Sequence, residues 1–332
     1  MLSMTNPLMA SDIESIHQLK QGIVYDVKGF TNDRIVIKME PQNSPESFKE
    51  HGKIINLFDP SSKAKALTQS ERLELKRYCD RIVETENFYK SIGGYTASDH
   101  AKACQYISED LASLRNYTFL KMQFQNVIDI GAAAKLYYEK GDKGLLNKIF
   151  GALSDVGGLE RLGAMIASDA FNGNFDRFFW EGPDVSVKIG PFHILFKALL
   201  NPGNVMISLG KNSSTIAMLD YVDPSSQFRD FNVPLAQCEK NQRLKWPVKH
   251  LLVQKDRLSF AKKVIDDLES LANPGKRFFS MGNKLGKGGA DRLAFGLYAA
   301  LNEISLAVKP RTLSPQCPIG LKERYNGLSN LK

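Results

Sequence analysis

The feature that most constrains the fold is a pair of short apolar runs near the middle of the chain. Residues 205–209 and 216–219 are apolar-rich, and the polar turn 210–214 joins them. Such a pair is typical of a β-hairpin. Asn204 precedes the first run and Asp220 follows the second. Because the two ends of a hairpin lie side by side, we expect these side chains to meet and to offer two oxygen ligands to Mg²⁺ or Mn²⁺.

A helix and a short loop precede this hairpin. Apolar residues recur at spacings of three and four between positions 159 and 170, which predicts a buried helix face. Gly173 and Asn174 interrupt the pattern, so Asp176 and Arg177 are expected on the loop after the helix. A carboxylate there would orient or deprotonate an acceptor hydroxyl, which phosphoryl transfer needs beside the metal ligands. A long loop is expected between Arg177 and the hairpin.

The order of these residues resembles the actin-fragmin kinase type of atypical kinase. The resemblance is carried by Asp169, Asn174, Asp176 and Arg177, then Gly203 and Asn204, then the apolar run that ends at Asp220. The Asp-Arg order is also similar to that of the phosphoinositide kinases. The resemblance implies that Asp176 is the catalytic aspartate, that Asn204 is the first metal ligand and that Asp220 corresponds to the aspartate of the DFG motif. Arg177 would orient the catalytic loop. The structural alternative is that Asp176 and Arg177 form an ordinary ion pair and that Asp220 caps a turn.

Residues 1–125 are expected to form the small β-rich lobe of such a kinase. Apolar-rich runs at 21–27 and 34–39 predict a hairpin. By the resemblance, Lys38 would reach the α and β phosphates of ATP, and Gly22 would stand in the phosphate-binding loop. The alternative for Lys38 is a solvated lysine on a strand.

Further elements are expected in the same lobe. Residues 117–124 alternate like a strand, on which Met122 would approach the adenine. Helices are predicted over 68–89, where Thr68 and Glu71 have capping-box spacing, and over 97–113, with Ser98 as a cap. A helix glutamate should pair with Lys38, and the candidates are Glu71, Glu74, Glu84 and Glu109. Residues 40–62 are rich in Pro, Ser and Lys and are expected to form an irregular connection.

Residues 126–235 are expected to form a helical lobe with the catalytic and metal motifs, and 236–332 a basic, mainly helical region with a frayed end. Residues 231–332 carry 18 Lys and Arg against 8 Asp and Glu, whereas the whole chain has a net charge of +8. The positive excess therefore lies entirely in the last third, which favours an anionic partner.

One basic, glycine-rich segment, 282–289, has the wrong spacing for a P-loop and lacks its Ser or Thr. The cations around it are instead predicted to bind an inositol polyphosphate or a phosphoinositide head group. They are Lys276, Arg277, Lys284, Lys287 and Arg292. The alternative is a solvated basic face. Nucleic acid is not expected, because no motif for it is present.

Together these patterns predict an α+β, two-lobed, protein-kinase-like fold. The four cysteines form no C-x-x-C and the five histidines no H-E-x-x-H, so zinc chemistry is not expected. No apolar run is long enough to span a membrane, and the first residues do not have the pattern of a secretory signal. Contact with a membrane surface is compatible with the basic region.

The expected function is an ATP- and divalent-metal-dependent atypical protein kinase. The chain also resembles bacterial effector kinases, Legionella-type ones among them. That resemblance implies a protein made in a bacterial cytoplasm and translocated into a host cell, with a protein or lipid substrate there. Two alternatives stay open: a lipid or inositol-phosphate kinase, and a pseudokinase that acts as a phosphoinositide- or partner-binding module.

Overall fold

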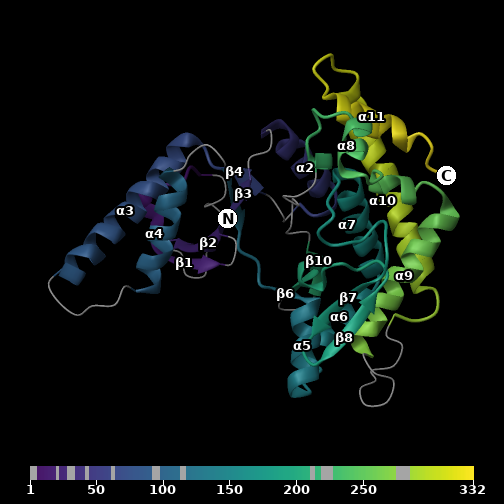
Figure 1. The fold of residues 1–332 in the computed structure, drawn as a ribbon, viewed down its shortest axis with the longest axis horizontal. Helices are drawn as coiled ribbons and strands as arrows, with labels where there is room; N and C mark the ends of the chain where they lie inside the picture. Colours follow the sequence, from purple (N-terminus) through teal and green to yellow (C-terminus); the bar gives the residue numbers. More distant parts are fainter. Residues whose placement is uncertain are drawn as a thin grey trace. The chain divides into compact units, whose positions relative to one another are not determined.

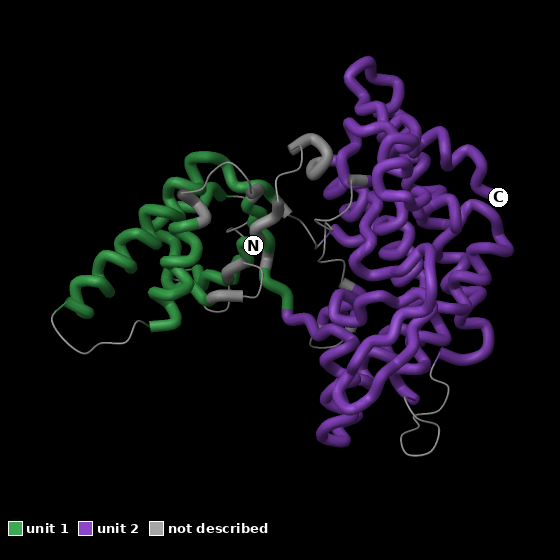
Figure 2. Tube along the Cα trace, viewed as in Figure 1, with its two compact units in different colours: residues 1–45, 62–125 green, residues 46–61, 126–332 purple. Residues whose placement is uncertain are grey.

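The computed structural model describes residues 6–19, 22–27, 34–41, 45–60, 64–91, 98–112, 117–209, 214–217, 227–273 and 285–332. They divide into two compact units (Figure 2). Unit 1 comprises residues 1–45 and 62–125, and unit 2 comprises residues 46–61 and 126–332. Helices occur together with small antiparallel sheets, so the prediction of an α+β fold is confirmed. None of the described helices is long and apolar enough to cross a bilayer.

Unit 1 is built on a five-stranded antiparallel sheet in the order β1-β2-β3-β5-β4 (Figure 1). Its strands are β1 Ile13–Leu19, β2 Gly22–Val27, β3 Arg34–Pro41, β4 Ala64–Ala66 and β5 Tyr117–Gln123. The hairpin and the later strand predicted for this region are therefore both present. In the central strand, Ile37 pairs with Ile23 of β2 and with Lys121 of β5.

Two helices, α3 Gln69–Ser91 and α4 Asp99–Ala112, pack on this sheet. Strand residues Ile16, Ile35 and Phe119 form one buried cluster with Leu75 of α3 and Ile107 of α4. Ile16 and Ile35 alternate with more exposed positions, as expected for a sheet with one face in the core. In β5, Leu120 and Met122 are buried as well.

Both predicted helix N-termini are confirmed by their caps. Glu71 N donates to Thr68 Oγ1 at 3.2 Å, and Thr68 N donates to Glu71 Oε2 at 2.9 Å, which is a capping box. Ala101 N donates to Ser98 Oγ at 3.1 Å. Each cap satisfies a backbone donor that the first turn of a helix leaves unpaired.

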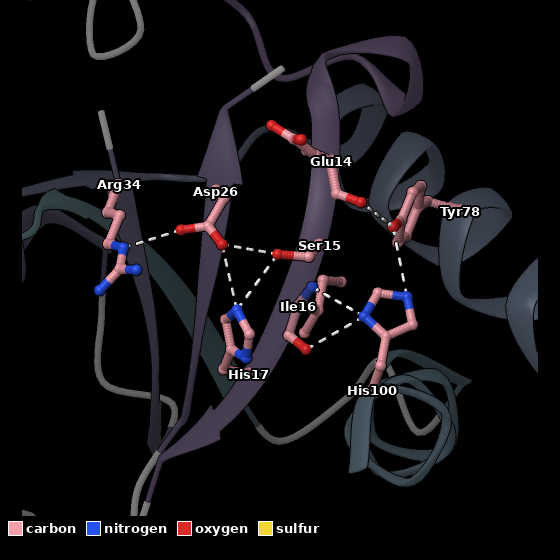
Figure 3. Close-up of polar contacts among 8 residues, drawn as sticks. All are labelled: Glu14, Ser15, Ile16, His17, Asp26, Arg34, Tyr78 and His100. Carbon is pink, nitrogen blue, oxygen red and sulfur yellow. Dashed lines mark hydrogen bonds and ion pairs between the residues drawn. The ribbon is translucent and has the colours of Figure 1, made fainter. Parts of the chain in front are cut away.

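The outer edge of β1 is tied to both helices (Figure 3). His100 Nδ1 on α4 lies 3.0 Å from Ile16 N and 3.1 Å from Ile16 O. Tyr78 OH on α3 donates to Glu14 O at 3.1 Å. An edge strand otherwise presents unpaired backbone groups that can pair with another chain, so these side chains close part of that edge.

Lys121 and Glu71 form an ion pair inside unit 1. Both side chains are buried, and Lys121 Nζ lies 3.2 Å from Glu71 Oε1. Lys121 Nζ also donates to Asn6 O at 2.7 Å, and the N–H groups of Leu8 and Thr68 donate to the Glu71 carboxylate at 3.0 and 2.9 Å. Burial raises the pKa of Glu71, but these hydrogen bonds and the ammonium group outweigh burial, so the net shift is downward.

Lys121→Met is expected to lower the free energy of unfolding by about 3–5 kcal/mol, because it leaves the buried Glu71 carboxylate without its cation. Urea unfolding at pH 7 measures this loss. The double variant with Glu71→Gln should recover part of the lost unfolding free energy.

The pH dependence of stability gives a second test of this pair. The pKa of Glu71 is lower in the folded chain than its ordinary value of 4.5, so its stabilising contribution is lost as pH falls through the folded value. For Lys121→Met, a loss of unfolding free energy below about 0.5 kcal/mol, the range of ordinary surface substitutions, would contradict the prediction.

Unit 2 is mainly helical. Its helices are α2 Pro45–Phe58 (in this unit from Glu46), α5 Ile130–Lys140, α6 Gly144–Ser154, α7 Gly158–Asn172, α8 Leu235–Gln242, α9 Gln254–Ala272, α10 Gly289–Thr312 and α11 Ile319–Leu328. The predicted helix over 159–170 is therefore present as α7. It packs closely against α10: a Cβ on Gly163 would lie 2.7 Å from Leu297 N, and one on Gly296 would lie 2.6 Å from Glu160 Cα. Glycine allows this approach because it has no Cβ.

Short strands complete unit 2. They are β6 Val127–Asp129, β7 Val185–Ile189, β8 Phe192–Phe196, β9 Met206–Leu209 and β10 Ser214–Ala217. Antiparallel β9 and β10 are the hairpin predicted around the turn 210–214, with Met206 opposite Ala217. β6 pairs with the other side of β9. Among the residues described, the 3-10 turns are η1 Ala10–Asp12, η2 Pro202–Asn204, η3 Gln227–Arg229 and η4 Pro247–His250.

Some expectations about local structure are wrong. The supposedly irregular stretch 40–62 contains α2, which begins at a proline, a residue that the first helical position tolerates. The loop expected after Arg177 contains the β7–β8 hairpin, whose turn includes Gly190 at φ +58°. The end expected to fray forms α11, because Leu321 and Arg324 are buried there.

Candidate active site

The structure brings Asp176 and Asn204 into contact in unit 2. Asp176 lies on the loop after α7, and Asn204 ends the 3-10 turn η2 just before β9. Asn204 Nδ2 donates a hydrogen bond to Asp176 Oδ2, across 28 residues of sequence. Asp220, predicted to complete the site, lies outside the described residues, as does the segment after Ala217 that leads to it.

Arg177 is buried and locks the loop to its surroundings. Its Nη1 donates to both carboxylate oxygens of Asp169 on α7, at 2.7 and 2.9 Å. Its Nε donates to the backbone oxygen of Asn204 at 3.0 Å. One guanidinium therefore joins the end of α7 to the turn that carries Asn204, and its bonds to the carboxylate are charge-assisted.

The turn between α7 and Asp176 follows from its sequence. Gly173 adopts φ +75°, the left-handed conformation in which helices commonly end. A Cβ at Gly173 would lie 2.2 Å from Phe228 Cβ, so space also requires glycine. Asn174 Nδ2 then donates to Asp169 Oδ1 at 3.0 Å, and Asn174 Oδ1 accepts from Asp176 N at 3.0 Å. The side chain of Asn174 thus sets the position of the Asp176 backbone.

The segment before Asn204 is held against the same loop. The N–H groups of Leu200 and Asn201 donate to Arg177 O at 3.0 and 3.3 Å. Asn201 Oδ1 accepts from Gly203 N at 3.1 Å and caps η2. Both partners of the Asp176–Asn204 contact therefore rest on hydrogen-bonded backbone, which suits a site that must hold a fixed geometry.

The residues predicted to bind ATP lie in unit 1, whereas the Asp176–Asn204 contact lies in unit 2. Lys38 and Gly22 are paired with each other in the β2–β3 register, and Lys38 is also opposite Leu120 of β5. Met122 is buried and pairs with Val36. By register, positions 22, 36, 38, 120 and 122 belong to the sheet face opposite the one that carries Ile37.

The sequence left open which glutamate would pair with Lys38. Glu71 pairs with Lys121, and Glu74 lies 2.6 Å from Arg77. Glu84 and Glu109 are exposed. The Lys121–Glu71 pair was missed from sequence. Its only signal in the sequence is a charged residue, Lys121, between the apolar residues Leu120 and Met122 of a predicted strand.

The predicted polyanion-binding residues are only partly described. Lys276, Arg277 and Lys284 lie outside the described residues, and Lys287 is exposed. Arg292 is engaged within the unit: it lies 3.2 Å from Glu160 Oε2 and donates to the carbonyls of Ser154 and Asp155 at 3.2 and 2.8 Å.

A polar cluster on β1, β2 and β3 has the residue types of a hydrolase triad but not its geometry (Figure 3). Ser15 Oγ donates to Asp26 Oδ2 at 2.6 Å, and His17 Nε2 lies 3.1 Å from each of these oxygens. A triad uses one ring nitrogen for the serine and the other for the aspartate, whereas here Nε2 faces both. Burial raises the pKa of Asp26, but the contacts with Ser15, His17 and the Arg34 guanidinium outweigh burial, so the net shift is downward. The hydrogen bonds of this cluster therefore connect β1, β2 and β3.

Among the residues that the structure describes, no group of three or more His, Cys, Asp or Glu side chains gathers as a metal site. The possible metal ligands at the Asp176–Asn204 contact are a carboxylate and an amide oxygen, which are ligand types that Mg²⁺ and Mn²⁺ accept. Compared with known proteins, the chain matches no protein-family model and no curated sequence at a significant level.

Proposed function

We propose that the chain is an ATP- and divalent-metal-dependent atypical protein kinase. The observation that carries the proposal is the contact between Asp176 and Asn204, with Arg177 buried beneath it. These residues come from a loop after a helix and from the entrance of a hairpin, in the order that the sequence resemblance requires. A metal ligand and an acceptor-binding carboxylate must be neighbours in phosphoryl transfer.

In this proposal Asp176 accepts the proton of the acceptor hydroxyl as the hydroxyl oxygen bonds to the γ-phosphorus. The bond from that phosphorus to the bridging oxygen breaks, and ADP leaves with the electron pair. Asn204 uses its amide nitrogen for Asp176, so Oδ1 is the atom that would hold Mg²⁺ or Mn²⁺ together with Asp220. The metal would neutralise charge on the phosphates. Lys38 and Met122 would hold the phosphates and the adenine.

The proposal assigns unit 1 as the small β-rich lobe and unit 2 as the helical lobe of a kinase-like fold. It is supported by the antiparallel sheet with α3 and α4 in the first unit and by the helices around α7 in the second. Translocation into a host cell and a protein or lipid substrate there stay predictions that rest on the sequence resemblance.

An inositol polyphosphate or phosphoinositide is proposed as a further ligand of the basic region. Exposed cations are present on the described part of residues 240–287, from α8 to the start of α10. They are Lys240, Arg243, Lys245, Lys249, Lys255, Lys262, Lys263 and Lys287. Exposed cations attract a polyanion through their summed field and through direct contacts with phosphate oxygens.

Thermal unfolding with ATP tests the proposal. ATP with Mg²⁺ or Mn²⁺ is expected to stabilise the protein by about 2.7 kcal/mol at 100 times Kd, and ATP without metal by much less. Asp220→Ala should lose the metal-dependent part. Inositol hexakisphosphate should add its own stabilisation in both proteins. No response to nucleotide under any of these conditions would favour a binding module over a kinase.

A further inference from the structure

One buried carboxylate outside the predicted site receives an unusual set of hydrogen bonds. Asp267 lies on α9, and 1% of its surface is exposed. Its Oδ2 accepts from the N–H groups of Lys197, Ala198 and Leu199 at 3.0, 2.7 and 2.8 Å, and its Oδ1 also accepts from Lys197 N at 2.9 Å. Three consecutive backbone donors therefore converge on a single side chain.

This arrangement carries an energetic cost. Burial raises the pKa of Asp267, and the donors from residues 197–199 offset only part of that rise. A carboxylate removed from water needs hydrogen-bond partners, and Asp267 has them in the backbone of residues 197–199. The bonded N–H groups belong to the segment that leaves β8, so Asp267 holds this segment against α9.

The clamped segment continues directly into the candidate site. Phe179 N donates to Ala198 O at 2.7 Å, and Phe178 forms a β-bridge with Leu199. The next residues, Leu200 and Asn201, donate to Arg177 O. Residues 197–201 thus run beside residues 177–179, one position from Asp176, and then enter the turn that ends at Asn204.

We propose that Asp267 is a positioning residue for the Asp176–Asn204 pair. By holding residues 197–199 it fixes the backbone on which both members of the pair rest. The inference rests on the proposed kinase function for its catalytic consequence, whereas its structural part concerns only the coupling between α9 and the site.

Asp267→Asn tests the inference, with Asp266→Asn as the matched control. Asp266 is adjacent on α9 but 64% of its side chain is exposed, and it lies 3.8 Å from Lys197 Nζ. In Asp267→Asn one acceptor becomes a donor that faces backbone N–H groups. A displacement of about 1 Å costs roughly 10²-fold in rate, so kcat should fall by about that factor while the KM for ATP changes less than about twofold. Asp266→Asn should change neither.

Hydrogen–deuterium exchange gives a readout that does not depend on activity. In Asp267→Asn the peptides that cover 197–201 and 174–179 should exchange faster, and peptides from α10 should not. Asp267→Glu should restore part of the protection and of kcat. Faster exchange confined to 197–201, or equal loss of protection throughout unit 2, would overturn the inference. If the wild-type protein transfers no phosphate, the kinase proposal fails, and the exchange pattern still decides the positioning role.

Discussion

Asp176→Ala is expected to lower kcat for phosphoryl transfer by about 10²- to 10⁴-fold, the usual contribution of a positioned general base. The acceptor hydroxyl would lose its proton acceptor, and Asn204 Nδ2 would lose the hydrogen-bond partner that orients its amide. The measurement is the initial rate of ADP formation, together with incorporation of labelled phosphate into the protein itself, at saturating ATP and Mn²⁺.

Asp176→Asn separates the two effects. It keeps an oxygen that can accept from Asn204 but removes the negative charge. We expect it to bind ATP and metal like the wild-type protein in thermal unfolding, and to transfer phosphate as slowly as Asp176→Ala. Wild-type turnover in either variant would show that this aspartate is an ordinary loop residue and would remove the catalytic assignment.

The second large effect is expected for Arg177→Met. Removal of one partner from a buried ion pair costs about 3–5 kcal/mol, because the Asp169 carboxylate remains buried after its cation is lost. The free energy of unfolding from denaturant titration measures this cost. Activity should be lost as well, since Arg177 Nε no longer fixes the backbone at Asn204.

The double variant Asp169→Leu/Arg177→Met distinguishes stability from function. Replacement of both charges by apolar groups of similar size can be nearly neutral for stability, so the double variant should regain much of the unfolding free energy. It should remain inactive, because the bond from residue 177 to Asn204 is still missing and Asn174 has lost its acceptor on Asp169. An active double variant would mean that Arg177 matters only for folding.

Local patterns allowed much of the fold to be predicted. The capping box at Thr68 and Glu71 and the apolar spacing of α7 act within a few residues, and the paired strands β9 and β10 are close in sequence. The β7–β8 hairpin was missed although Gly190 and Pro191 mark its turn, and its two strands are only five residues long. α2 was missed because, apart from Phe48, its large apolar residues occupy only its last turns.

Part of the candidate site could likewise be predicted from the sequence, and part could not. The elements that carry Asp176 and Asn204 could be predicted from local patterns, whereas the expectation that the two residues share a site came from the resemblance to kinases. The partners of Asp267 could not, because they lie 68 to 70 residues away and are backbone groups, which carry no sequence signature. Lys121 and Glu71, 50 residues apart, likewise find each other only after the sheet and helices have packed.

The placement of α2 has a consequence for how this protein can be divided. The chain passes from one unit to the other at residues 45–46, 61–62 and 125–126. His51 packs edge-on against Phe231, at 4.6 Å between ring centroids, and Ile54 and Ile55 are buried. Cleavage of the polypeptide after residue 125 would leave α2 on fragment 1–125, although α2 belongs to unit 2 together with residues 126–332. Each isoleucine then exposed would forfeit about 1.5–3 kcal/mol, so the two halves should be soluble and folded only when produced together.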